Sequence, residues 1–189
     1  AYNFMDGING ITGGYSLVVL VALAYINEAV VPFVEQGFIL TVLCSVVVFN
    51  FFNFRKQAKC FAGDVGSVSI AFVILFLIGM LIIRTENFSW IVLLAVYGVD
   101  SVLTIIHRLM LHENIALPHR KHLYQIMANE LKIPHMVVSL VYMLVQAVVI
   151  AGYLLFPGNE YGYLSGTIIV LSLVYILFMK RFFCLHQAK

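Results

Sequence analysis

Two glycine-rich segments each contain an aspartate whose surroundings suit phosphate or metal chemistry. Asp6 lies in Asn3-Phe4-Met5-Asp6-Gly7-Ile8-Asn9-Gly10, and Asp64 lies in Phe61-Ala62-Gly63-Asp64-Val65-Gly66-Ser67. Glycines allow positive φ and a close approach of the backbone to a ligand. A carboxylate where a helix begins can cap that helix, or can bind Mg²⁺ beside an N-terminus that attracts phosphate. These residues alone leave two simpler alternatives open, a flexible loop before a helix for the first segment and a cap for Asp64.

A third candidate is an aspartate inside an apolar stretch. Tyr97, Asp100, Thr104, His107 and Arg108 recur at helical spacing and form one polar stripe. An ionisable residue in a membrane segment is costly and normally faces the bundle interior or a wet cavity. Asp100 could pair structurally with a neighbouring helix. We favour a functional role, because the stripe leads out towards a basic loop.

That basic loop is His119-Arg120-Lys121-His122-Leu123-Tyr124-Gln125. Its four consecutive cation-capable side chains could bind a diphosphate, because arginine offers bidentate contacts while lysine and histidine add charge and donors. A solvated loop that touches anionic lipid headgroups is an equally good interpretation of the same residues.

The elements that must position these residues are membrane helices. The 189 residues are 62% hydrophobic and 11% charged, with a mean hydropathy of +1.00 and a formal charge of +2. Soluble domains carry about 25% charged residues, so the composition excludes a soluble globule, and the small charge excludes a nucleic-acid partner. The apolar runs are continuous, which favours helices over a barrel. We predict an all-α, polytopic membrane protein with six transmembrane helices in a single domain, residues 1–189. The predicted spans are Tyr15–Val34, Gly37–Phe54, Val65–Ile83, Phe88–Ile106, Met136–Phe156 and Tyr163–Met179.

The basic residues predict which side of the bilayer each connection faces. With six crossings, every Lys and Arg except Arg84 falls on one face, and such residues accumulate on the cytoplasmic side. Both termini and the segments 1–14, 55–64 and 107–135 are therefore predicted to be cytoplasmic. All the candidate residues above share that face.

In order and spacing, these motifs resemble those of the polyprenyl-phosphate N-acetylhexosamine-1-phosphate transferases. This superfamily includes the enzymes that begin peptidoglycan-lipid, enterobacterial common antigen and O-antigen synthesis. The first segment resembles the family's Asn-x-x-Asp-Gly-x-Asp-Gly motif, and the second resembles its Phe-x-Gly-Asp-x-Gly-Ser motif. Asp100 with His107-Arg108 resembles the aspartate and basic residues of a later helix, and residues 119–125 stand where many members carry His-x-His-His. The chain resembles the C-terminal half of such an enzyme, so Ala1–Gly14 is expected to be the interior of a longer protein.

The resemblance implies an activity and a set of site residues. Members transfer a sugar phosphate from a UDP-N-acetylhexosamine to undecaprenyl phosphate, release UMP and use Mg²⁺ (or Mn²⁺), here expected at the cytoplasmic face of the bacterial inner membrane. A homodimer is compatible with such a protein. The implied roles are catalysis for Asp6, Asp64 and Asp100, metal binding for Asp64, and substrate binding for Asn3, Gly7, Phe61, Arg108, His119, Arg120 and His122.

Two departures from the family pattern narrow these expectations. Asn9 replaces the second aspartate of the first motif, and the histidine motif is reduced to His119 and His122, which is closer to the branch that primes O-antigen. The family's adjacent aspartate pair for the acceptor phosphate is absent from this sequence, so we expect the fragment alone to be inactive. The alternative from another class is a transporter or channel in which Asp100 binds an ion or proton. Transporters usually carry broken helices at mid-membrane, whereas the glycines and acids here gather at one interface.

Overall fold

The computed structural model is a bundle of membrane-length helices, and it describes residues 2–115, 117, 120–156 and 158–187. Within those residues, six helical stretches are long and apolar enough to cross a bilayer. The predicted multi-pass helical protein is thereby confirmed. The stretches are α2 (Ile11–Ala29), α3 (Gln36–Asn53), α4 (Gly63–Thr85), the pair η1 (Phe88–Leu94) and α5 (Ala95–Met110), α7 (His135–Leu155) and α8 (Glu160–Gln187).

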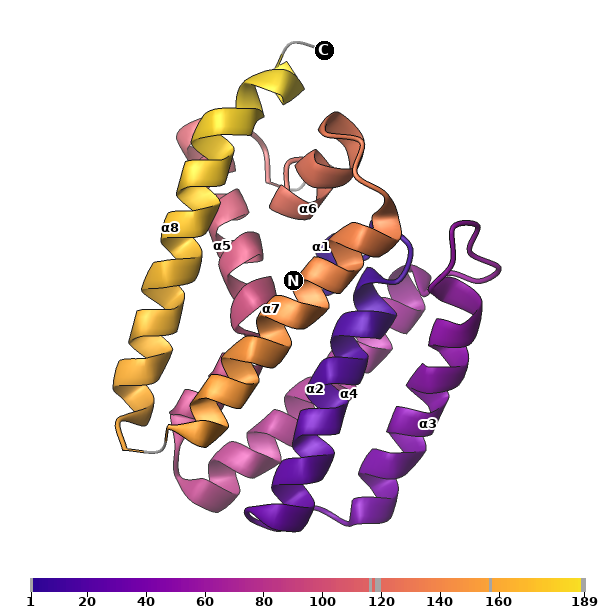
Figure 1. Cartoon of the computed structure of the whole chain (residues 1–189), viewed down its shortest axis with the longest axis vertical. Helices are drawn as coiled ribbons and strands as arrows, with labels where there is room; N and C mark the ends of the chain where they lie inside the picture. Colours follow the sequence, from indigo (N-terminus) through magenta and orange to yellow (C-terminus); the bar gives the residue numbers. More distant parts are fainter. Residues whose placement is uncertain (1, 116, 118–119, 157, 188–189) are drawn as a thin grey trace.

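Three short elements complete the described chain: α1 (Tyr2–Met5), α6 (Leu123–Gln125) and η2 (Ile126–Glu130), of which the last is a π-helix. Helix α2 is the most buried of the membrane-length helices and packs against α3, α4 and α7, whereas α8 is the least buried and packs mainly on α5. In Figure 1 the α2–α3, α4–η1 and α7–α8 connections lie at the lower end of the bundle. The α3–α4 and α5–α7 connections and the C-terminal end of α8 lie at the upper end, as the alternation of the spans requires.

The first span begins earlier than predicted, at Ile11 rather than Tyr15. Gly13 and Gly14 therefore belong to α2 instead of a loop. A Cβ on Gly13 would lie 2.7 Å from the side-chain oxygen of Asn50 in α3, and one on Gly14 would lie 2.5 Å from the sulfur of Met143 in α7. These glycines let α2, α3 and α7 approach one another closely. The segment 1–14, predicted as a loop, is partly helical, because α1 and the first turn of α2 lie within it.

The fourth span is not one continuous α-helix as predicted. Residues Phe88–Leu94 form a 3-10 helix, and the α-helix begins at Ala95. The side-chain amide of Gln146, from α7, donates to the carbonyl of Val92 at 3.0 Å and accepts from the N–H of Val96 at 3.1 Å. In an α-helix those two backbone groups would bond to each other. Gln146 takes the place of that bond where η1 meets α5.

Candidate functional site

The N-terminal segment lies against the first turn of α4. The side chain of Ser67 donates to the side-chain oxygen of Asn3 at 2.9 Å. The carboxylate of Asp6 accepts from the hydroxyl of Thr12 at 2.7 Å and from the backbone N–H of Gly63. These bonds bring Asn3, Asp6 and the turn that carries Asp64 together, although nearly sixty residues separate the two segments in the sequence. We call Asn3, Asp6 and Asp64 the acidic site.

The acidic site concentrates negative charge without an ion pair among the residues that the structure describes. Burial raises the pKa of Asp6 above its ordinary value, and the charge of Asp64 adds to that rise, while the bonds from Thr12 and Gly63 oppose it. Asp64 is exposed and lies within the first turn of α4, after Ala62 at the N-cap position. The capping alternative for Asp64 is therefore not the arrangement observed.

The donor set of the acidic site fits Mg²⁺. This ion usually binds one or two carboxylates and completes its octahedral shell with water and substrate phosphates. Asp6 and Asp64 supply two carboxylates, and Asn3 adds an amide beside them. Within the described residues, no group of three or more His, Cys, Asp or Glu side chains is arranged to hold a metal ion.

Surroundings of the acidic site are open on one side and tightly packed on the other. Phe61 is 73% exposed, and Gly63 adopts φ +59° with open space where a Cβ would project. A Cβ on Gly7, by contrast, would lie 2.3 Å from the hydroxyl of Tyr124. The absence of a side chain at Gly7 is therefore needed for its packing against Tyr124. Its predicted contact with substrate stays a prediction.

Two asparagines hold the α3–α4 connection to the N-terminal segment. Asn53 accepts from the N–H of Gly10, at φ +84°, and donates to the carbonyl of Cys60, both at 2.8 Å. Asn9 donates to the carbonyl of Arg55 at 3.0 Å. Asn53 was not singled out in the sequence, because a lone asparagine at the end of an apolar helix carries no local signal. Asn9, where the family motif has an aspartate, thus has a structural use.

Asp100 lies at the centre of a second, buried polar cluster. One carboxylate oxygen accepts from the N–H of Leu123 at 3.1 Å and from Thr104 at 3.2 Å, and contacts Nδ1 of His122 at 3.3 Å. The other accepts from the hydroxyl of Tyr142 at 2.7 Å. Protein groups from α5, α6 and α7 thus surround this carboxylate, so the structure gives an ion-binding transporter site at Asp100 no support. Its catalytic role stays a prediction.

The predicted diphosphate-binding cluster is divided among several uses. Lys121 pairs with Glu113, whose pKa is lowered first by the hydrogen bond from Lys121 and further by Arg108. His122 is buried beside Asp100, and Arg120 is exposed. His119 lies outside the described residues.

Arg108 is buried and its donors hold the connection that follows α5. They reach the carboxylate of Glu113 at 3.2 Å and the carbonyls of Asn114, Ile115 and Leu117 at 2.6–3.2 Å. The structure therefore gives Arg108 a structural use, and its predicted substrate contact stays untested.

The fold and the acidic site together define a multi-pass membrane protein with a hard-oxygen donor set at one end of its bundle. Residues 1–84 match the family described as glycosyl transferase family 4. The resemblance inferred from the motifs is confirmed over these residues, which include both glycine-rich aspartate motifs.

Three relatives are similar to parts of the chain. The probable undecaprenyl-phosphate N-acetylglucosaminyl 1-phosphate transferase of Bacillus subtilis (strain 168) is 30% identical over 128 residues, which are 66% of this chain and 36% of the relative. Phospho-N-acetylmuramoyl-pentapeptide-transferases of Lactobacillus acidophilus and Lactobacillus helveticus are 36% identical over 70 residues, 37% of this chain and 21% of each relative. The chain thus spans about a third or less of the length of these relatives. No solved structure matches it.

Proposed function

We propose that the chain is the donor-binding part of a membrane sugar-1-phosphate transferase. In the proposed reaction, a phosphate oxygen of undecaprenyl phosphate attacks the sugar-bearing phosphorus of a UDP-N-acetylhexosamine. The bond from that phosphorus to the bridging oxygen breaks, and UMP leaves with the bond's electron pair. The products are UMP and a polyprenyl-diphosphate-linked sugar. The names of the relatives support this class, and the resemblance of the histidine motif favours the branch that primes O-antigen.

The observation that carries the proposal is the adjacency of Asp6 and Asp64, which comes from two motifs far apart in the sequence. Two carboxylates that form no ion pair with the described residues match a cation-bridged diphosphate donor. Bound Mg²⁺ would neutralise charge that develops on the transferring phosphoryl group. Asp6 and Asp64 would hold that ion, and Asn3, fixed by Ser67, would donate its amide N–H groups to a phosphate oxygen.

Exposed side chains around the acidic site would bind the rest of the donor. Phe61 presents a free aromatic ring on which uracil can stack, because every base has a π-face. Arg120 is the exposed cation of the described α5–α7 connection that best suits the diphosphate, and the role of His119 rests on the family resemblance alone. Arg120 belongs to the end of the bundle at which the basic residues gather, which we propose faces the cytosol of a bacterium, where UDP-sugars are made.

The test is Asp64→Asn in the full-length protein, with UMP release measured across a Mg²⁺ titration. Asparagine is nearly isosteric but lacks the charge, so we expect a loss of about 10²–10³-fold at ordinary Mg²⁺, comparable to removal of an electrostatic catalytic group. Part of that loss should be recovered at high Mg²⁺. Glu28→Gln, which neutralises an exposed carboxylate near the end of α2, is the matched control and should release UMP at the wild-type rate. Near-normal release by the Asp64 variant, with normal yield and melting temperature, would refute the metal role.

A further inference from the structure

We propose that Asp100, acting through Tyr124, is a positioning residue that holds the N-terminal segment of the acidic site against α4. The inference rests on the proposed function for its kinetic consequences. The structural part of the proposal is that Asn3 and Asp6 are kept in place by this anchoring. In this role the buried carboxylate of Asp100 does not contact the substrate.

Asp100 first fixes the short helix α6. Its carboxylate accepts from the backbone N–H of Leu123 and contacts the ring of His122, so it holds the residues on either side of the N-terminus of α6. The same carboxylate is itself held from α7 by the hydroxyl of Tyr142. A hydroxyl–hydroxyl contact of 2.8 Å between Thr104 and Tyr175 extends the cluster to α8. A charged acceptor with this many donors in a buried site forms stronger bonds than a neutral one.

Tyr124 then transmits this anchoring to the N-terminal segment. It directly follows Leu123, its side chain is fully buried, and its hydroxyl donates to the backbone carbonyl of Phe4 at 2.9 Å. The same hydroxyl occupies the space where a side chain on Gly7 would project. Burial, followed by the nearby charges of Asp100 and Asp6, raises the pKa of Tyr124, so the hydroxyl keeps its proton and remains a donor.

In the sequence, Phe4 lies between Asn3 and Asp6, the two residues of this segment that belong to the acidic site. Tyr2, at the start of the segment, is anchored by its ring against Tyr97, with centroids 5.1 Å apart. Asp6, at the end, is anchored by Thr12 and Gly63. Between them, the segment is held by the bond from Ser67 to Asn3 and by the bond from Tyr124 to the Phe4 carbonyl. Removal of the Tyr124 bond should therefore loosen Asn3 and Asp6 without unfolding the bundle.

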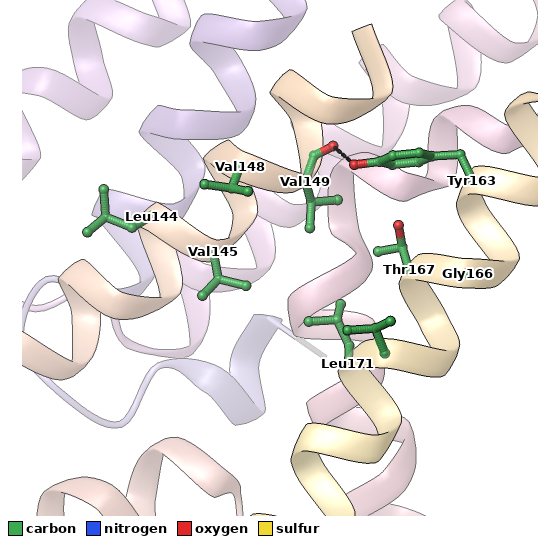
Figure 2. Close-up of a pocket in the computed structure, with 9 residues that line it drawn as sticks. Leu144, Val145, Val148, Val149, Tyr163, Gly166, Thr167 and Leu171 are labelled. Carbon is green, nitrogen blue, oxygen red and sulfur yellow. Dashed lines mark hydrogen bonds between the residues drawn. The ribbon is translucent and has the colours of Figure 1, made fainter. Parts of the chain in front are cut away.

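The other end of the bundle offers a matched control. Tyr163 of α8 donates its hydroxyl to the backbone carbonyl of Val149 in α7 at 2.9 Å (Figure 2). That hydroxyl also fills the space where a Cβ on Gly152 would project, 2.2 Å away. It borders an apolar groove of about 560 Å³ that contains none of the predicted site residues. Tyr163→Phe therefore removes the same kind of bond, beside the same kind of glycine, far from the acidic site.

The first measurement is hydrogen–deuterium exchange on the full-length protein in detergent, which needs no activity. Loss of one buried hydrogen bond corresponds to about a threefold to tenfold change in a local opening equilibrium. Tyr124→Phe should raise exchange in residues 2–12 by about that factor and leave residues 146–165 unchanged. Tyr163→Phe should do the reverse, and Asp100→Asn should raise exchange in both 2–12 and 120–126. Unchanged exchange in residues 2–12 for Tyr124→Phe or Asp100→Asn would overturn the positioning role.

The second measurement is UMP release over a Mg²⁺ titration. Tyr124→Phe should raise the Mg²⁺ concentration for half-maximal rate by about threefold to tenfold, with a near-normal rate at saturation, because the ligands are loosened and not removed. Tyr163→Phe should match the wild type. A fall in the saturated rate with no shift in Mg²⁺ dependence would contradict positioning. If exchange changes as expected while the wild type releases no UMP, the proposed function fails and the positioning role stands.

Discussion

Replacing Gln146 with leucine should convert the broken fourth span into a continuous helix. The Gln146 amide separates the carbonyl of Val92 from the N–H of Val96 and also accepts from the hydroxyl of Tyr15 at 2.6 Å. Leucine has nearly the same volume and no polar atoms. Once the amide is gone, the two backbone groups can bond directly, as they would in an α-helix.

The magnitude depends on whether that closure occurs. Side-chain hydrogen bonds within membrane proteins contribute about 0.6 kcal/mol on average and at most about 1.7 kcal/mol. If Val92 and Val96 bond to each other, only the Tyr15 hydroxyl loses its acceptor, and the destabilisation should stay below about 2 kcal/mol. If the break persists, three interactions are lost, and the destabilisation should reach about 2–5 kcal/mol. Closure is therefore the favoured outcome.

Closure has a geometric signature. A 3-10 helix rises about 2.0 Å per residue and an α-helix about 1.5 Å, so conversion of the seven residues of η1 should shorten the span by about 3.5 Å. Phe88 and Met110 are both exposed. Spin labels at these two positions, in a background without the native cysteines, would report the change in their separation by pulsed electron paramagnetic resonance. Tyr15→Phe removes the bond to the amide and the longer bond from the N–H of Tyr97 at 3.5 Å, but it keeps the amide itself, so it should leave the distance unchanged. An unchanged distance in the Gln146 variant would refute this account of the break.

Three further predictions follow from single residues. The hydrogen bond from Lys121, helped by Arg108, lowers the pKa of Glu113, so its stabilisation is complete above the ordinary carboxyl pKa of about 4 and is lost as pH falls below that value and through the lowered pKa; the melting-temperature difference between wild type and Glu113→Gln should shrink from pH 7 to pH 3, and a constant difference would contradict it. Gly10→Ala should destabilise by more than about 1 kcal/mol, because φ is +84° and the new Cβ would meet an aromatic ring, whereas Gly79→Ala has open space and should be neutral or stabilising in chemical denaturation. With native cysteines replaced, a cysteine at Asn159 should react with an impermeant thiol reagent applied outside cells and one at Gln57 should not; the opposite pattern would invert the predicted orientation.

The helical membrane architecture could be predicted from the sequence because its causes are local. A continuous apolar run long enough to cross the bilayer must satisfy its own backbone, and a helix does so within the segment. The observed spans agree with the predicted ones to within a few residues at most ends. The two glycine-rich aspartate motifs were equally visible, since their composition differs from that of the apolar runs around them.

Only the tertiary structure decided how these residues are used. The break in the fourth span depends on Gln146, about fifty residues further along the chain, and the lack of room for a side chain at Gly7 depends on Tyr124. Arg108 has the residue type of a ligand for phosphate, yet the folded chain directs its donors to its own carbonyls. Hydrogen-bond partners distant in sequence leave no periodic signal, and burial determines which polar groups must find one. The sequence therefore identified the candidate residues, while long-range packing determined that Asp6 meets the turn carrying Asp64 and that Asp100 is enclosed by protein donors.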